Sequence, residues 1–270
     1  MGAKILIIDH NDSFTYNLVG LFEQEGTEDC QVDVWPVDQL HTVDQHLIWE
    51  YDCLVLSPGP GLPRDYPAVT SLLDSVLGKD KIKSLPVLGI CLGLQTLVTY
   101  FGGTLYNLKQ IQHGRQVALC LKTCPAVAEA GSKASGKADT GGPDIFKHLN
   151  TPVKVGLYHS WAVSIGPGTV PDVGGHQKEG KLNSNFWEKI QKQAPTGLEI
   201  TAVACIDKSG FRFAESPSAI AAPVVMGVRH LSLPVIGLQF HPESYMTPEG
   251  AGIIRNWLEF IMEIQRRQTE

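Results

Sequence analysis

Apolar residues in the first hundred positions follow two alternating patterns, one typical of strands and one typical of helices. Residues Ala3–Asp9 form a nearly continuous apolar run, as expected for a strand covered on both faces of a parallel sheet. Residues Ser13–Glu25 then carry apolar side chains at helical spacing, and Gly26 follows as a stop signal. The same criteria predict strands at Val32–Val37, Cys53–Ser57 and Val87–Ile90, and helices at Tyr66–Leu77 and Leu92–Phe101. This alternation predicts an α/β fold with a doubly wound, mostly parallel sheet and flanking helices.

The pattern changes from Gln116 onward, where short apolar runs are separated by turn signals. Strands are predicted at Val153–Tyr158, Glu199–Ile206, Val224–Val228 and Val235–Phe240, before a closing helix at Glu249–Gln265. We expect these strands to extend the sheet in antiparallel fashion. Three segments rich in Gly, Ser, Pro or Lys lack periodicity and are predicted to be surface loop insertions: 126–144, 166–197 and 209–223. Residues 1–270 are expected to form a single domain around one core.

Composition and net charge limit the kinds of binding partner and the cellular compartment that we expect for this protein. The net charge of −6 and the absence of a basic run argue against nucleic acid as a partner. The longest apolar stretches, such as Leu85–Leu94, are too short to span a membrane, and the start of the chain has strand character. The six cysteines are scattered, and the one close pair, Cys120 and Cys124, lacks a second pair to complete a zinc site. No metal is therefore expected, and five cysteines are interpreted as reduced thiols. We expect a cytoplasmic protein.

The sixth cysteine, Cys91, lies where a predicted strand runs into a predicted helix. The sequence Gly89-Ile-Cys-Leu-Gly93 has the spacing of a nucleophile elbow, because glycines two residues on either side give a tight strand-to-helix turn the room it needs. The thiol would then lie at a helix N-terminus, which favours a thiolate. A buried structural cysteine between two packing glycines is the alternative.

A base for this thiol is expected just beyond the predicted strand Val235–Phe240. His241 is placed to accept the thiol proton, and Glu243 to orient the imidazole. Loops at the carboxyl ends of parallel strands are where sites form in open α/β sheets, which brings this segment and Cys91 to one edge. His159 has no acidic residue two positions after it and is interpreted as structural.

The segment Leu56–Gly61 has the sequence Leu-Ser-Pro-Gly-Pro-Gly and follows the strand Cys53–Ser57. Glycine backbone can approach a ligand closely, and a tetrahedral oxyanion needs N–H donors. We assign this role to the N–H groups of Gly59 and of Leu92. Taken alone, the same segment is an ordinary turn.

Together these motifs resemble the triad, or class I, glutamine amidotransferases, in particular those that serve chorismate-using enzymes. The resemblance extends from Ile5 to Ser244 and includes further segments in the family's order, namely Asp12–Asn17, His113-Gly114, Tyr158-His-Ser160 and Met226–His230. It implies a flavodoxin-like fold with the catalytic residues Cys91, His241 and Glu243. It also implies that glutamine lies along Gly59, Pro60 and Gly61, touches Gln95 and is held by the backbone of Ser160 and Trp161.

The same resemblance implies an activity: hydrolysis of L-glutamine to glutamate and ammonia, without a cofactor, for a chorismate-binding synthase that Asp12–Asn17 and His113-Gly114 would face. Trp161 and the long insertions favour an aminodeoxychorismate synthase, on the route to para-aminobenzoate and folate, and a chain that is the N-terminal part of a longer polypeptide. The alternatives are the glutaminase component of anthranilate synthase, a γ-glutamyl thiol hydrolase, and a catalytically silent docking subunit.

Overall fold

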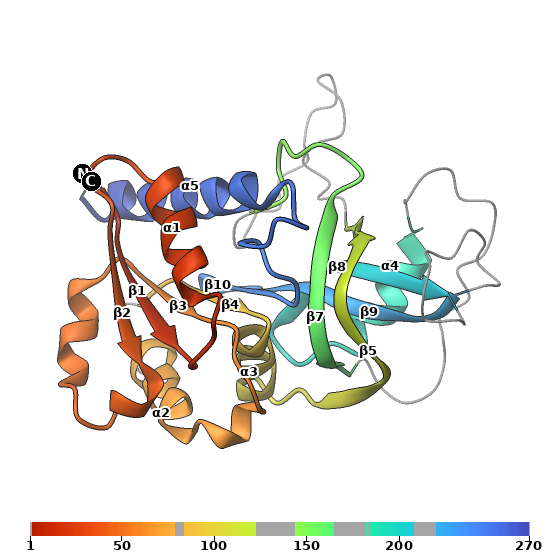
Figure 1. Ribbon diagram of the computed structural model, residues 1–270, viewed down its shortest axis with the longest axis horizontal. Coiled ribbons are helices and arrows are strands. Elements are labelled where there is room, and N and C mark those ends of the chain that lie inside the picture. Colours follow the sequence, from red (N-terminus) through yellow and green to blue (C-terminus); the bar gives the residue numbers. More distant parts are fainter. Residues whose placement is uncertain are drawn as a thin grey trace.

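A computed structural model of the chain describes residues 2–78, 84–122, 144–164, 182, 184–207 and 220–269. Within them a large mixed sheet is covered by helices, and a small second sheet stands beside it (Figure 1). The large sheet has eight strands in the order β2-β1-β3-β4-β10-β9-β8-β6, and the small sheet pairs β5 with β7. The predicted α/β architecture is confirmed.

The first five strands of the large sheet are parallel, with helices on both faces. Their order matches that of flavodoxin-like doubly wound sheets. The strands are β1 (Lys4–Asp9), β2 (Gln31–Pro36), β3 (Cys53–Leu56), β4 (Val87–Ile90) and β10 (Val235–Leu238). The helices are α1 (Thr15–Glu25), α2 (Pro67–Leu77), α3 (Leu92–Tyr100) and α5 (Gly250–Thr269), with 3₁₀ turns at Val37–Gln39, Gln45–Glu50 and Pro63–Asp65.

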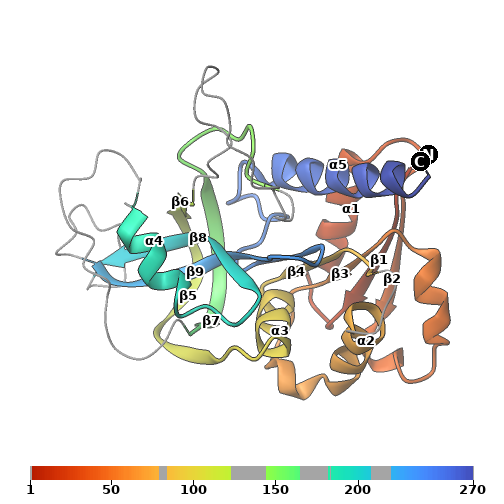
Figure 2. The ribbon, with the colours of Figure 1, turned by 180° about the vertical axis from the view of Figure 1, so that it is seen from behind.

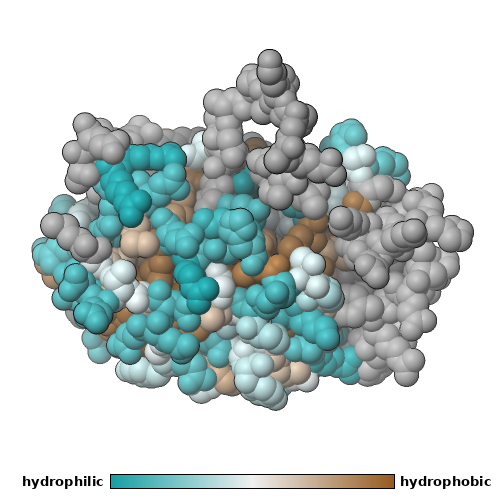
Figure 3. Space-filling model, turned by 90° about the horizontal axis from the view of Figure 1, so that it is seen from above, coloured by the Kyte–Doolittle hydropathy of each residue, from teal (hydrophilic) through white to brown (hydrophobic). Residues whose placement is uncertain are grey.

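Strand β1 shows why its sequence is a continuous apolar run. Ile5 and Ile7 pack into one core with α1 and α5, whereas Leu6 and Ile8 pack into a second core with α2. Successive side chains of a strand point to opposite faces, so a strand between two helical layers needs apolar residues at every position. Seen from behind, α2 and α3 lie on the opposite side of the sheet from α5 (Figure 2). The outer face of the α5 side is mostly hydrophilic, with small separate apolar areas (Figure 3).

Three antiparallel strands complete the large sheet beyond β10: β9 (Ile220–His230), β8 (Leu198–Asp207) and β6 (Cys120–Leu121). This extension was predicted. Strand β7 (Lys154–Val163), however, does not join it as expected. It pairs with β5 (Leu105–Ala118) in the separate two-stranded sheet, and β5 itself was missed because its polar residues and Gly114 interrupt any strand pattern.

The predicted insertions need two corrections. Within 166–197, residues Ser184–Gln191 form helix α4, which buries Phe186, Trp187 and Ile190 at helical spacing. Within 209–223, residues 220–223 belong to β9. Residues 192–197 continue from α4 through turns, whereas 166–181, 183, 209–219 and nearly all of 126–144 lie outside the described residues. Among the described helices, none is long and apolar enough to cross a membrane.

Candidate active site

Cys91 lies at the sharp turn between β4 and α3, at the carboxyl edge of the parallel strands. Its backbone has φ 52° and ψ −100°, a conformation that residues other than glycine rarely adopt. Its N–H donates to the carbonyl of Leu238 at 2.7 Å, which ties the turn to β10. The residue is only 7% exposed. A strained strand-to-helix turn of this kind sets a nucleophile at the start of a helix.

The two flanking glycines of this turn are required by close packing. A Cβ on Gly89 would lie 2.5 Å from the backbone of Gly93, and a Cβ on Gly93 would lie 2.3 Å from the carbonyl oxygen of Leu56. Real Cβ atoms do not approach backbone this closely, so neither position accepts a side chain without a shift. The two glycines of the Gly-x-Cys-x-Gly sequence therefore allow the turn to close tightly and to pack against the end of β3.

His241 and Glu243 follow β10 and are buried beside this turn. The His241 Nδ1 lies 2.6 Å from the Glu243 Oε1, and the side chains are 5% and 0% exposed. The carbonyl of His241 accepts a hydrogen bond from Thr247 Oγ1 at 2.6 Å, while the same oxygen of Thr247 accepts from the N–H of Gly156 on β7. Hydrogen bonds to its ring and to its backbone carbonyl thus fix the position of His241.

The protonation of His241 is set by its two neighbours. Burial lowers its pKa, but its interactions with Cys91 and Glu243 outweigh burial and raise the pKa to about 10. Because Nδ1 is engaged with Glu243, Nε2 is the ring nitrogen left to interact with Cys91 and to exchange a proton with its thiol. The raised pKa favours an imidazolium between Cys91 and Glu243, the arrangement expected of a Cys-His nucleophilic pair.

The loop after β3 is held against the end of β1 by His10 and Ser57. The His10 N–H donates to Ser57 Oγ at 2.9 Å, and Ser57 Oγ donates to the carbonyl of Pro58 at 2.6 Å. A Cβ on Gly59 would lie 2.4 Å from the Cβ of His10 and 3.1 Å from a methyl of Leu92. Gly59 therefore lies beside the first residue of α3, where the sequence analysis placed both oxyanion donors.

The exposed end of this loop is fixed by Tyr66. The Tyr66 hydroxyl donates to the carbonyl of Pro60 at 2.9 Å, and its ring meets that of His10 edge-on with centroids 5.0 Å apart. Gly61 has φ 77°, in the region that favours glycine. Sequence reasoning missed His10 and Tyr66, because neither belongs to a motif and both act through packing.

The remaining predicted residues meet at the small sheet. Gln95 is 4% exposed, and its Nε2 donates to the carbonyl of Trp161 at 3.1 Å. Ser160 precedes Trp161 on β7 and is half-buried. His159 Nδ1 lies 2.9 Å from the same carbonyl, and burial lowers its pKa to about 4, so it is a neutral donor with no carboxylate partner among the described residues. These contacts fit the structural role expected of it.

Aromatic side chains line the site next to His241. The rings of Tyr158 and Phe14 lie 5.1 and 6.1 Å from the His241 ring, and His113 lies 5.4 Å from Tyr158. Burial raises the pKa of Asp12, which interacts electrostatically with His241. The segments Asp12–Asn17 and His113-Gly114 are therefore brought together near His241, although they are far apart in sequence.

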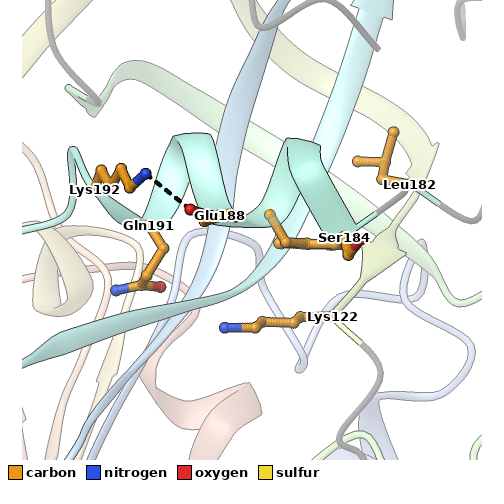
Figure 4. Close-up of a pocket in the computed structure, with 7 residues that line it drawn as sticks. Lys122, Leu182, Ser184, Glu188, Gln191 and Lys192 are labelled. Atoms are coloured by element: carbon orange, nitrogen blue, oxygen red, sulfur yellow. Dashed lines mark hydrogen bonds and ion pairs between the residues drawn. The ribbon is translucent and has the colours of Figure 1, made fainter. Parts of the chain in front are cut away.

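A cavity of about 660 Å³ lies elsewhere, between α4 and the edge of the large sheet (Figure 4). Its amide and charged groups already have partners. Gln191 Nε2 donates to the carbonyl of Leu198 at 2.7 Å, Lys122 pairs with Glu199, and Lys192 pairs with Glu188. These side chains are therefore engaged with one another or with the backbone.

Comparisons with known proteins identify the family to which the chain belongs. Residues 6–260 match the family described as glutamine amidotransferase class-I. A putative anthranilate synthase component II of Haemophilus influenzae is 34% identical over 257 residues, covering 94% of this chain and 95% of that protein. Anthranilate synthase component 2 of Pseudomonas aeruginosa is 31% identical and covers 94% of each chain. A crystal structure of a glutamine amidotransferase from Thermotoga maritima has the same fold, with a TM-score of 0.53 at 15% identity over 99% of this chain and 86% of that one.

The chain belongs to the class I glutamine amidotransferases, because the family match spans nearly its whole length. The fold and the order of its motifs are those of that class. In this chain His241 interacts with both Cys91 and Glu243 at the carboxyl edge of the parallel strands.

Proposed function

We propose that this chain hydrolyses glutamine at Cys91 and donates the ammonia to a chorismate-using synthase of the anthranilate type. The observation that carries the proposal is the buried arrangement of Cys91, His241 and Glu243, with the thiol at the start of α3. A catalytically silent docking subunit would have no need of a strained cysteine, a histidine and a carboxylate in one buried cluster. Relatives named as anthranilate synthase components support the choice of partner.

The chemistry begins with the Cys91 thiolate attacking the side-chain amide carbon of glutamine. The C=O electron pair moves to oxygen, and the N–H groups of Gly59 and Leu92 stabilise the oxyanion. Collapse of this intermediate expels the nitrogen, which takes its proton from His241 and leaves as ammonia. Water, deprotonated by His241, then hydrolyses the γ-glutamyl thioester, releases glutamate and restores the thiolate. Glu243 stabilises the imidazolium at each stage.

Glutamine would lie between the β3 loop and β7. The backbone of Gly59, Pro60 and Gly61 would follow its side chain, while the carbonyl and N–H groups of Ser160 and Trp161 would bind its charged ends. Gln95 lines the same space from α3, because it lies one helical turn after Cys91. The contact of Gln95 with Trp161 supports this interpretation, since it joins the helix that carries the nucleophile to the strand that would hold the substrate.

The anthranilate partner replaces the aminodeoxychorismate partner that the sequence favoured. That choice depended on Trp161 and on a long middle region. Length does not separate the two classes, because the alignment with the Haemophilus influenzae relative already covers 94% of this chain and 95% of that protein. The names of the relatives favour anthranilate synthesis, in which the ammonia is transferred to chorismate.

Exposed aromatic residues near the site support a partner that docks there. The side chains of Tyr16 and Tyr245 are 72% and 91% exposed, and Phe14, which is 37% exposed, lies over Tyr158 and His241. Aromatic residues are enriched at protein interfaces. A synthase covering this rim would also keep the released ammonia from escaping into solvent.

The test pairs the chain with a chorismate-using synthase and supplies either glutamine or ammonium chloride. We expect wild-type chain to support synthesis from both, and Cys91→Ala to support it from ammonium alone, because ammonia bypasses the thiol. The product should be anthranilate. Glutamine-dependent synthesis with Cys91→Ala would overturn the assigned chemistry, and aminodeoxychorismate as the product would overturn the assigned partner. A γ-glutamyl peptide cleaved faster than glutamine would indicate a hydrolase instead.

A further inference from the structure

Gln239 is buried and contacts the nucleophile Cys91, and none of the sequence motifs gave this glutamine a role. It follows the last residue of β10, Leu238, and its side chain is fully buried. Its Nε2 lies 3.7 Å from the Sγ of Cys91, within the range of an N–H to sulfur hydrogen bond, since sulfur is larger than oxygen. Gln239 comes two residues before His241, so one short segment brings two polar groups to the same thiol.

The orientation of this amide is fixed by a chain of hydrogen bonds that ends at a backbone carbonyl. The carbonyl oxygen of Trp161 only accepts, so the Gln95 atom 3.1 Å from it must be the nitrogen. That nitrogen has a second hydrogen, which points to Gln239 at 3.4 Å, and the atom receiving it must be the oxygen, Oε1. The nitrogen of Gln239 is then left facing Cys91. The carbonyl of Trp161 therefore fixes the orientation of both side-chain amides, and exchanging the oxygen and nitrogen of either one would break this set of hydrogen bonds.

We propose that Gln239 is a positioning residue that holds the Cys91 thiolate by N–H donation to Sγ, with Gln95 and Trp161 locking the donor in place. This inference rests on the proposed function of Cys91. A hydrogen bond to a charged acceptor is stronger than a neutral one, and this donor is buried where water does not compete. This hydrogen bond stabilises the thiolate relative to the thiol and fixes the orientation of the Cys91 side chain.

The charged and titratable groups around the thiol come from three other elements. His241 lies beside it with Glu243 behind, while Asp12 from the segment before α1 and His159 from β7 both interact electrostatically with His241. Gln239 and Gln95 are uncharged at every pH. Replacing either one with methionine therefore changes hydrogen bonding to the sulfur without adding or removing a titrating group.

The experiment measures the rate at which iodoacetamide alkylates Cys91 between pH 5 and 10, about the range over which thiols titrate, by mass spectrometry of the Cys91 peptide. Alkylation requires the thiolate but neither glutamine nor an oxyanion hole, so it isolates the state of the sulfur. We expect Gln239→Met, which keeps the side chain's length and removes the donor, to move the midpoint of the profile up by about one pH unit. Gln239→Glu should move it further, because a carboxylate repels the thiolate.

The matched control is Gln191→Met on α4. Gln191 also holds two backbone groups through its amide, the carbonyl of Leu198 and the N–H of Ile200, but it lies at the cavity of Figure 4. The same substitution there should leave the alkylation profile unchanged. Gln95→Met should shift the profile in the same direction as Gln239→Met by a smaller amount, and it should add little in the double variant, because both act through one bond.

Coincidence of the Gln239→Met profile with those of wild type and Gln191→Met would overturn the inference. If Gln239→Met does not fold, as judged by its thermal transition, Gln239→Glu decides, and an unshifted profile there also overturns it. Failure of the proposed function looks different. In that case the wild-type chain would release no glutamate from glutamine, or the Cys91→Ala variant would still release it. Either result would hold whatever the alkylation profiles show.

Discussion

The His241 Nδ1 and the Glu243 Oε1 lie 2.6 Å apart, and both side chains are almost completely withdrawn from solvent. This bond fixes the tautomer of the neutral ring, because an Nδ1–H that donates to a carboxylate leaves Nε2 to accept the proton of the thiol. The second oxygen of Glu243 is buried without a hydrogen-bond partner in the described residues, so His241 is its main counter-charge. The pair should therefore behave as one unit.

Glu243→Gln tests this unit. The variant keeps the size of the side chain but removes the charge and allows the wrong ring tautomer, so kcat for glutamine should fall by roughly 10²–10⁴-fold with KM little changed. Steady-state release of glutamate measures both constants. Glu249→Gln is the control, since Glu249 bonds Asn150 at the surface. A Glu243→Gln variant that keeps full turnover would show that His241 needs no orienting carboxylate.

Tyr66→Phe tests whether the loop after β3 must be held in place. The lost hydroxyl frees the carbonyl of Pro60, so the neighbouring Gly59 N–H should point less well at the oxyanion, and kcat should fall about 10-fold. Tyr100→Phe is the matched control: its hydroxyl bonds Asp74 at 3.0 Å, on α2, away from the loop. Equal kcat values for the two variants would mean that this loop does not set the rate.

Stability should fall as pH drops from about 6.5 to 4 because of His10. Burial lowers the pKa of His10 in the folded chain to about 4, against 6.5 for a free histidine. Between these values the unfolded state binds more protons than the native state, so unfolding becomes easier by about 1.4 kcal/mol for each pH unit lost. Urea unfolding of wild type and His10→Asn should show a shallower fall in the variant. Identical slopes would mean that His10 is already protonated at neutral pH or does not resist protonation.

Local patterns predicted the parts of the fold and site that depend on neighbouring residues. The Gly89-x-Cys91-x-Gly93 turn was readable because its glycines and thiol are adjacent, and β1 was readable because burial on both faces demands an unbroken apolar run. Helix α4 was missed because its Phe186, Trp187 and Ile190 sit in a stretch otherwise rich in turn formers. The separate sheet of β5 and β7 depends on pairing partners that no local pattern specifies.

The same distinction explains which site contacts went unseen. His10 reaches Ser57 across 47 residues, and Gln239 reaches Cys91 across 148. Such contacts are set by the strand order, since β1 and β3 are neighbours and so are β4 and β10. A sequence shows that a glutamine follows an apolar strand, but the sheet decides that its amide meets the nucleophile.

The central claim is that Cys91 forms a covalent bond to substrate, and the most direct measurement is the mass of the chain during turnover. Rapid acid quenching of wild-type chain with excess glutamine should trap a fraction carrying one γ-glutamyl group, and digestion should map that group to the peptide containing Cys91. Cys91→Ala should carry none and release no glutamate. A γ-glutamyl group on any other residue, or glutamate release by Cys91→Ala at the wild-type rate, would contradict the account.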